Sequence, residues 1–214
     1  MWSERLPMDC PLGKLVVISG PSGVGKTTIL RLLLQKIPQL FSSVSATTRP
    51  PRVGEQNGID YYFLDESEFN RRRTAGEFLE CCQVYGRQHW YGTLQAEVAP
   101  RLATGDWVVL EIDVEGTLSV VARYPDAITI FVEPADSEQL KQQLQKRGTE
   151  TAEAIARRLE VAHRELLQAD LYRYRVTNTT VAEAVVAIEN VLTAAGLLDN
   201  PTSPFRNNQH QSNA

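Results

Sequence analysis

Two kinds of hydrophobic pattern alternate along this chain. Continuous apolar runs, typical of strands buried on both faces of a sheet, occur at residues 15–18, 107–112 and 127–132, and residues 41–45 and 172–176 are further candidate strands. Helical spacing of apolar residues predicts helices at 30–37, 93–104, 114–123, 137–146, 155–166 and 181–192, and Pro100 should kink or shorten the second of these. Alternating strands and helices indicate an α/β fold, a parallel sheet with helices on both faces.

Residues 46–90 interrupt this alternation. The segment is rich in Gly, Pro, Arg and Tyr and contains only short β-like pieces, such as residues 60–64. We therefore expect a core formed by residues 13–45 and 91–198, with residues 46–90 as an inserted subdomain. We expect residues 1–12 to be an N-terminal tail and the polar residues 199–214 to be a disordered tail.

Composition narrows the class of protein. The chain is 43% hydrophobic and 22% charged, which excludes a fibrous or wholly disordered protein. Its net charge of −4 argues against a general nucleic-acid-binding protein or a polybasic membrane binder. Three cysteines are too few for a disulfide framework, and no apolar run approaches the ~18 residues of a membrane span. Since the first residues do not resemble a signal peptide either, we expect a cytoplasmic protein.

A phosphate-binding motif follows the first predicted strand. Residues 20–27 fit G-x-x-x-x-G-K-[ST] at every position, and the predicted strand and helix flank them as this motif requires. The glycines allow backbone N–H groups to converge on phosphate oxygens, and the helix directs its positive end at the same place. We expect Lys26 to reach the β- and γ-phosphates of ATP and Thr27 to bind Mg²⁺. The expected ATP-binding residues of this segment are Gly20, Pro21, Ser22, Gly23, Val24, Gly25, Lys26, Thr27 and Thr28.

Carboxylates end the apolar run at residues 107–112. P-loop proteins need an acid near the hydrated Mg²⁺. We therefore expect Thr27 to bind the ion directly and Asp113 or Glu111 to bind it through water. Residues 113–116 also fit the D-x-x-G pattern of GTPase switch regions. No N-K-x-D guanine-reading motif follows later in the chain, so a GTPase is the weaker interpretation.

Two arginines flank a Pro-Pro pair in the predicted insertion. Arg49 and Arg52 are three residues apart, and the fixed φ of the prolines leaves their guanidinium groups little entropy to lose on binding. Such a pair suits one phosphate monoester dianion. The same part of the chain supplies further polar side chains: Tyr61, Glu80, Tyr91 and Thr93.

Together these motifs resemble the guanylate kinase family of ATP-dependent GMP kinases. The resemblance covers about residues 14–192, and its carriers are residues 20–27, 45–52 with 54–55, 60–63, 76–80, 91–93, 110–113 and 147–150. It implies a P-loop NTPase-type core with an inserted GMP-binding subdomain and a small mobile lid at about residues 136–154. It also implies reversible transfer of the γ-phosphate of ATP to GMP or dGMP, with Mg²⁺ as the cofactor. The implied partners are these nucleotides, without nucleic acid, membrane or an obligate protein partner.

The resemblance also assigns roles to single residues. The residues implied for GMP binding are Ser45, Arg49, Arg52, Tyr61, Glu80, Tyr91, Thr93 and Glu111. Among them, Glu80 and Thr93 would read the guanine base with help from Glu111. Asn178, in contrast, is implied for ATP binding, on the adenine side. The implied catalytic residues, which offset charge on the transferring phosphoryl group, are Lys26, Arg49, Arg147 of the lid and Arg158 of the helix after it.

Three features depart from the family pattern. Glu111 stands where the family usually has Asp, Thr-Asn-Thr at residues 177–179 replaces the usual Asn-Asp pair, and residues 86–90 are about one residue longer than usual.

Two other function classes stay open. Glu80 and Thr93 speak against a ribose 1,5-bisphosphate kinase of similar build. The intact P-loop speaks against a non-catalytic, peptide-binding domain of the guanylate-kinase-like type.

Overall fold

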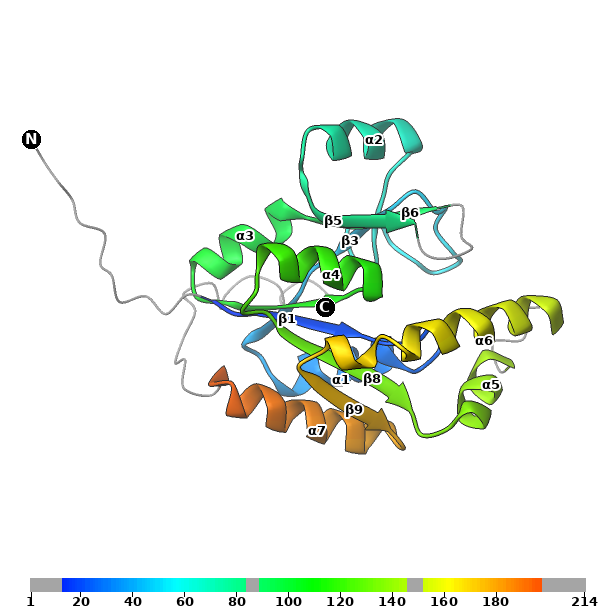
Figure 1. The fold of residues 1–214 in the computed structure, drawn as a ribbon. Helices are drawn as coiled ribbons and strands as arrows, with labels where there is room; N and C mark the ends of the chain where they lie inside the picture. Colours follow the sequence, from blue (N-terminus) through cyan, green and yellow to red (C-terminus); the bar gives the residue numbers. More distant parts are fainter. Residues whose placement is uncertain (1–12, 84–88, 146–151, 198–214) are drawn as a thin grey trace, which may run out of the picture.

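Five parallel strands form the central sheet of the computed structural model, which describes residues 13–83, 89–145 and 152–197 (Figure 1). In spatial order they are β2 (Leu40–Ser42), β7 (Trp107–Glu111), β1 (Leu15–Ser19), β8 (Ile128–Pro134) and β9 (Tyr174–Asn178). The predicted α/β fold with a parallel sheet is therefore confirmed. Because the strands are parallel, their carboxyl ends share one edge, where open α/β sheets bind their ligands.

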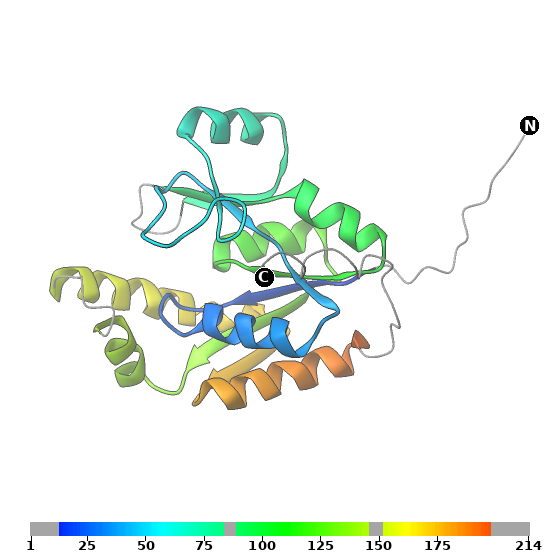
Figure 2. The same ribbon diagram turned by 180° about the vertical axis from the view of Figure 1, so that it is seen from behind.

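Helices cover both faces of the central sheet (Figures 1 and 2). One face packs against α1 (Lys26–Lys36) and α7 (Val181–Ala194). The other packs against α3 (Gln95–Ala103) and α4 (Val114–Arg123). The sheet is thus the middle layer of three, which explains the continuous apolar runs of its inner strands β7, β1 and β8.

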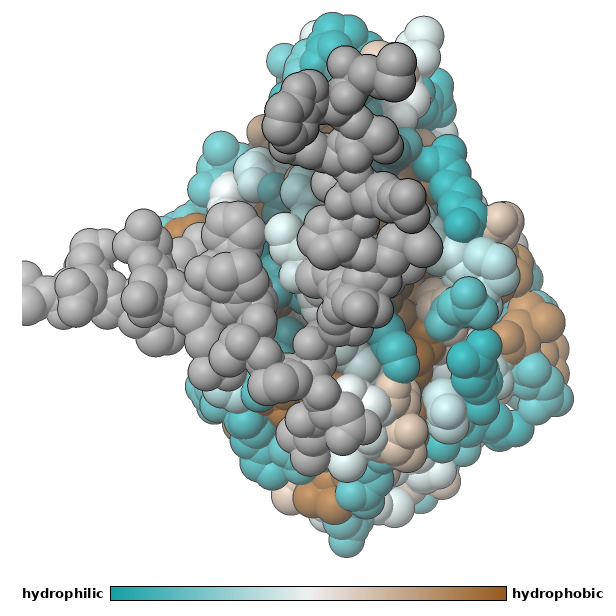
Figure 3. Space-filling model, turned by 90° about the vertical axis from the view of Figure 1, so that its left-hand side faces the viewer, coloured by the Kyte–Doolittle hydropathy of each residue, from teal (hydrophilic) through white to brown (hydrophobic). Residues whose placement is uncertain are grey.

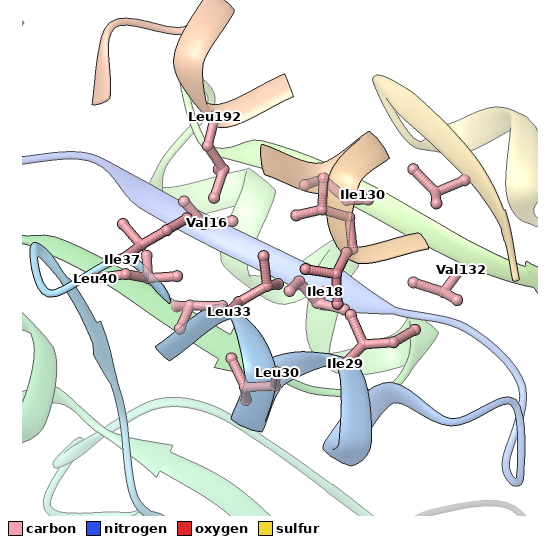
Figure 4. Packing of buried hydrophobic residues seen from close by; sticks show 14 of the residues in the cluster. Val16, Ile18, Ile29, Leu30, Leu33, Ile37, Leu40, Ile130, Val132 and Leu192 are labelled. Carbon is pink, nitrogen blue, oxygen red and sulfur yellow. The ribbon is translucent and has the colours of Figure 1, made fainter. Parts of the chain in front are cut away.

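Alternation along β1 serves both layers. Val16 and Ile18 belong to the hydrophobic cluster of α1 and α7, and Figure 4 shows them in the same cluster as Leu33 of α1 and Leu192 of α7. Their neighbour Val17 belongs instead to the cluster on the α3 and α4 side. All five residues of β1 are buried, so this strand fixes the position of the loop that follows it.

A second sheet of four strands lies above the central one in Figure 1, with α3 and α4 between the two sheets. Its strands, in order, are β4 (Tyr62–Phe63), β3 (Ser45–Thr47), β6 (Trp90–Leu94) and β5 (Phe78–Gln83), and α2 (Glu66–Thr74) covers it. The sheet spans residues 45–94, so the two ends of the predicted insertion, 46 and 90, fall inside its strands. The domain division itself stays a prediction.

Two helices lie at the right of Figure 1, α5 (Ser137–Gln145) and α6 (Ala152–Leu166). Leu140 and Ala162 are buried between them. The short 3-10 helix Ala169–Leu171 then leads to β9. The predicted lid, residues 136–154, therefore includes α5 and the start of α6, and its middle lies outside the described residues.

Several predicted boundaries were wrong. Residues 41–45 do not form one strand, because β2 and β3 belong to different sheets. Thr93 is not helical: it pairs with Ser45 and Glu80 in the second sheet, and the helix begins at Gln95. Pro100 does not end this helix, since the buried Val98 and Leu102 hold α3 on the core although one backbone donor is missing.

The surface is mixed in character. In Figure 3, hydrophobic and hydrophilic residues are interspersed over the part of the face that is not grey. Exposed large hydrophobic side chains, such as those of Val53, Leu118 and Val186, lie in different parts of the fold. Within the described ranges, no helix combines the length and the apolar character needed to cross a membrane.

Candidate active site

The loop at residues 20–27 joins β1 to α1 at the carboxyl edge of the central sheet. Gly20, Gly23 and Gly25 have φ angles of 142°, 96° and 97°, which L side chains rarely adopt. A Cβ at Gly20 would also lie 2.1 Å from the carbonyl oxygen of Val132 in β8. Only glycine therefore lets the chain leave the sheet here, and the loop leads directly into the positive N-terminal end of α1.

Two cationic side chains contact this loop. Lys26 donates from Nζ to the carbonyl oxygens of Gly20, at 2.6 Å, and Pro21, at 3.1 Å. Arg158, which comes from α6, donates from its guanidinium group to Ser22 Oγ at 2.8 Å. Both positive charges thus lie where the motif would place phosphate oxygens.

Asn178 anchors the loop from the far edge of the sheet. Its Nδ2 donates to the carbonyl oxygen of Val24 at 2.7 Å, and both side chains are buried. Gln139 of α5 in turn donates to the carbonyl oxygen of Asn178 at 3.0 Å. The residue that the sequence assigns to adenine therefore already holds the loop through its own amide, and it links the loop to α5.

Thr27 contacts Glu111 at the end of β7. Thr27 Oγ1 donates to Glu111 Oε1 at 2.8 Å, and the Thr27 side chain is exposed at the start of α1. Alcohol and carboxylate oxygens are the donors that Mg²⁺ accepts, so these two residues fit a site for it beside bound phosphates. The described part of the chain contains no cluster of three or more His, Cys, Asp or Glu side chains that could hold a metal by itself.

Asp113 has a different environment from Glu111. Its Oδ1 accepts the N–H of Gly116 at 2.9 Å, which caps α4, and its two carboxylate oxygens lie 3.3 and 3.4 Å from the donating thiol of Cys82. Burial and the charge of Asp113 raise the pKa of this thiol. Of the two acids predicted for the metal side, Glu111 is the one that contacts Thr27.

A row of polar side chains crosses the second sheet. Ser45 in β3 lies opposite Thr93 in β6, and Glu80 in β5 lies opposite the same threonine, so the three share one face. A register shift between Phe78 and Glu80 makes this possible. Phe78 pairs with Leu94 and packs in the cluster beneath α2, whereas Glu80 turns to the face with Thr93.

Glu80 is a buried acid. The residue is only 5% exposed, and its Oε1 accepts a hydrogen bond from Thr93 Oγ1 at 2.7 Å. Burial, and then the charge of Asp113, raise the pKa of Glu80 to about 7, although the bond from Thr93 opposes this shift. Near neutral pH the group therefore changes charge readily.

Arg49 lies in a cluster of aromatic and acidic groups. It donates to Glu55 Oε1 at 2.8 Å, and its guanidinium carbon lies 5.4 Å from the ring centroid of Tyr61. The rings of Tyr61 and Tyr91 are 6.1 Å apart, edge to face. Glu55 also accepts the backbone N–H of Arg52 at 2.7 Å, while the Arg52 side chain is exposed. One acid thus braces both arginines of the predicted pair.

The second sheet and the central sheet face each other at the end of β7. Burial raises the pKa of Tyr61, and the nearby charge of Glu111 raises it further. Glu80 interacts in the same way with Asp113. The carboxylates at the end of β7 therefore lie close to the polar residues of the second sheet, which connects the predicted ATP and GMP residues.

The structure collects the predicted residues into two groups. Beside the loop lie Ser22, Val24, Lys26, Thr27, Glu111, Arg158 and Asn178. On or beside the second sheet lie Ser45, Arg49, Arg52, Tyr61, Glu80, Tyr91 and Thr93. Thr28 is exposed in the first turn of α1, and Arg147 lies outside the described residues. Glu55 and the place of Asp113 beside Glu80 were missed, although the Gly54-Glu55 and D-x-x-G patterns were visible in the sequence.

Comparisons with known proteins agree on one family. The family model described as Guanylate kinase matches residues 12–195. The guanylate kinase of Gloeobacter violaceus is 47% identical over 190 residues, which are 89% of this chain and 92% of that protein. That of Rhodopirellula baltica is 46% identical over 183 residues, 84% and 87% of the two chains. The crystal structure of guanylate kinase from Anaplasma phagocytophilum has a TM-score of 0.72 at 28% identity and covers 93% of this chain and 98% of that one.

Proposed function

Because this chain belongs to the guanylate kinase family, we propose that it transfers the γ-phosphate of ATP reversibly to GMP and dGMP. It is an ATP-dependent nucleoside monophosphate kinase, and ADP and GDP are its products with GMP. The family uses ATP with a divalent metal, and we propose Mg²⁺ for this member. The second acceptor, dGMP, follows because the groups proposed below for the acceptor read the base and the phosphate.

The buried pair of Glu80 and Thr93 carries this proposal. Guanine presents N1–H and the exocyclic N2 amine side by side, and one carboxylate can accept from both. Adenine presents a bare N1 acceptor at the same edge, which would leave a buried carboxylate unpaired. Sites of this kind reject the mismatched substrate by about 10⁴-fold. The neighbouring Asp113, whose charge acts on Glu80, would supply a second acceptor.

The cluster around Arg49 would bind the phosphate of GMP. Arg49 and Arg52 supply two guanidinium groups, and the hydroxyl groups of Tyr61 and Tyr91 supply neutral donors. Glu55 holds Arg49 in place before any nucleotide arrives, through the bond at 2.8 Å. Ser45 lies in the same sheet, opposite Thr93, between this cluster and the base-reading pair.

The P-loop would bind the phosphates of ATP. Backbone N–H groups of residues 20–27 and the positive end of α1 provide the cradle, and Lys26 moves from the loop carbonyls to the β- and γ-phosphates. Thr27 and Glu111 would hold Mg²⁺. When bound, the ion neutralises charge on the β- and γ-phosphate oxygens.

Transfer needs no nucleophile from the protein. A phosphate oxygen of GMP attacks the γ-phosphorus of ATP in line, and the bond to the bridging β–γ oxygen breaks, so the electron pair leaves with ADP. Lys26, Arg49 and Arg158 would offset the negative charge on the transferring phosphoryl group, and we propose the same role for Arg147. Closure of α5 and α6 over the P-loop would exclude water and limit ATP hydrolysis.

We propose that the partners of the protein are these small molecules alone, without nucleic acid, membrane or an obligate protein partner. The run of arginines on α2 supports this: Arg71 and Arg72 are paired with Glu68 at 2.7 and 2.6 Å, and the Arg73 guanidinium carbon lies 4.4 Å from the centroid of the Trp90 ring. A cytoplasmic location is proposed with the same function, and the free thiols of Cys81 and Cys82 support it.

An acceptor panel tests this function. The purified full chain would be assayed with ATP and Mg²⁺ against GMP, dGMP, AMP, CMP, UMP and ribose 1,5-bisphosphate, with ADP release as the readout. We expect turnover with GMP and dGMP and none detectable with AMP. Turnover only with ribose 1,5-bisphosphate would assign the fold to the alternative kinase, and no turnover with any acceptor would favour a binding domain.

A further inference from the structure

The D-x-x-G pattern at residues 113–116 forms the first turn of α4. Asp113 is the N-cap residue, and its side chain accepts the N–H of Gly116 at 2.9 Å. Gly116 itself is buried and lies within the helix. Glycine inside a helix costs about 0.5–1 kcal/mol relative to alanine, so its use here needs another physical reason.

Crowding by two carboxylates supplies that reason. A Cβ at Gly116 would lie 2.9 Å from Glu80 Oε2, 3.3 Å from Glu80 Cδ and 3.3 Å from Asp113 Oδ1. The three nearest atoms all belong to carboxylate groups. Figure 1 places α4 beside β5, the strand that carries Glu80, so the helix backbone forms one wall of the space that holds this side chain.

Glu80 has little freedom to avoid such a Cβ without losing its position. Its other oxygen, Oε1, is held by Thr93 Oγ1 at 2.7 Å. The Asp113 carboxylate also lies beside Gly116, and the hydrogen bond from the Gly116 N–H holds it there. The carboxylate would therefore have to rotate or withdraw, although the backbone around it could stay unchanged.

Gly92 shows the contrast with a glycine that the sheet itself requires. A Cβ at Gly92 would lie 2.8 Å from the backbone oxygen of Glu80 and 2.8 Å from the Cβ of Cys81. Neither atom can move without disturbing β5. At Gly116 the obstructed atoms are instead the end of a side chain, so a substitution there should change the site more than it changes the fold.

Resting on the function proposed above, we propose that Gly116 is a specificity-determining positioning residue for the GMP site. Because Gly116 has no side chain, the Glu80 carboxylate can lie against the helix backbone. This position of the carboxylate sets the preference for guanine over adenine. The D-x-x-G pattern here therefore shapes a base-reading site: Asp113 and the N–H of Gly116 set the helix turn, and the bare Cα of Gly116 leaves room for Glu80.

Substitution of Gly116 by Ala tests this role, with Ser119→Ala as the matched control. Ser119 lies on the same helix with an exposed side chain, so its replacement adds helix propensity without approaching Glu80. We expect Gly116→Ala to raise KM for GMP at least tenfold and to lower the preference for GMP over AMP, while KM for ATP stays within twofold. Ser119→Ala should leave all three unchanged. GMP kinetics of Gly116→Ala within twofold of the wild type would overturn the proposal.

A double-mutant cycle with Glu80→Asp separates positioning from general damage. Aspartate is one methylene shorter and withdraws the carboxylate from residue 116, so Gly116→Ala should then add less than twofold to KM for GMP. Independent, multiplying effects would contradict the contact. If Gly116→Ala alone melts early, normal melting of the double variant still supports the contact, and early melting of both refutes it. Wild-type enzyme without GMP turnover would instead refute the proposed function, on which this inference rests.

Discussion

The ATP half and the GMP half of this active site are built in different ways. The ATP half is a continuous loop, residues 20–27, that acts mainly through backbone N–H groups and the end of α1. The GMP half gathers single side chains from β3, the loop after it, β5 and β6. Its position therefore depends on strand register, on the bulge before Glu80 and on burial.

This difference predicts how each half responds to change. The loop is proposed to bind the phosphates of ATP, which is the donor in every reaction. Damage to the loop should therefore lower the activity of the enzyme with every acceptor. A set of side chains around one base and one phosphate should lose GMP alone and leave the use of ATP intact. Substitutions in either half, and a change of pH, can break or sharpen this contrast.

The largest effect is expected for Lys26→Ala. The half-buried Lys26 side chain donates to loop carbonyls at 2.6 and 3.1 Å, so its removal should leave the hydrophobic core intact and the fold stable. Loss of one charge contact to the transferring group should lower kcat at least about a hundredfold. Steady-state kinetics and a thermal melt check both points. Retention of a tenth of wild-type turnover with an unchanged melt would contradict the assignment.

Glu80→Gln should come next and should act on GMP alone. A charge-assisted pair of bonds to guanine becomes a neutral, partly mismatched pair, which costs about 2 kcal/mol, or roughly 30-fold in kcat/KM for GMP. KM for ATP should stay within twofold. An unchanged preference for GMP over AMP would mean that base reading lies elsewhere, and Asp113 would be the next residue to test.

The thermal stability of the same variant provides its control. The folded-state pKa of Glu80, about 7, lies above the ordinary value of 4.5, so its contribution to stability is present below pH 4.5 and is lost as the pH rises through 7. At pH 8 the buried charge opposes folding, and Gln removes it. The nucleotide-free variant should therefore melt no earlier than the wild type at pH 8, and a much lower melting temperature would make its kinetics uninterpretable as base reading.

A smaller effect is expected for Arg52→Ala. The exposed Arg52 guanidinium would contribute one charge-assisted contact to the GMP phosphate, so its loss should raise KM for GMP about tenfold with little change in KM for ATP. Arg49→Ala should also lower kcat, because Arg49 is proposed to reach the transferring group. Equal rises in both KM values for Arg52→Ala would place that arginine on the ATP side.

The smallest effect is the pH dependence of GMP binding. Since guanine needs the ionised form of Glu80, protons should compete with GMP as the pH falls from 8 to 6, and KM for GMP should rise several-fold. The phosphate of GMP titrates in the same range, with a pKa of about 6. Glu80→Gln is therefore the matched control, because it keeps only the phosphate titration. Identical profiles for the two proteins would remove Glu80 from the pH dependence.

The sequence by itself determined the inner strands of the central sheet and the ATP half. Apolar runs such as residues 15–18 and 107–112 identify buried strands because a strand between two helix layers has no polar face. The loop at residues 20–27 is readable because its function depends on adjacent residues and on glycine φ angles, which are local properties. The family resemblance also pointed to the individual GMP residues.

Only the tertiary structure decided how those GMP residues meet. The pairing of Ser45, Thr93 and Glu80 depends on strand register, and a register shift after Phe78 turns Glu80 to the polar face. The same holds for the two acids near the end of β7: sequence spacing offered both for the metal, but Glu111 contacts Thr27 whereas Asp113 caps α4 beside Glu80. Contacts between residues far apart in the chain carry no local signal, because they depend on how strands and helices pack rather than on the residues next to them.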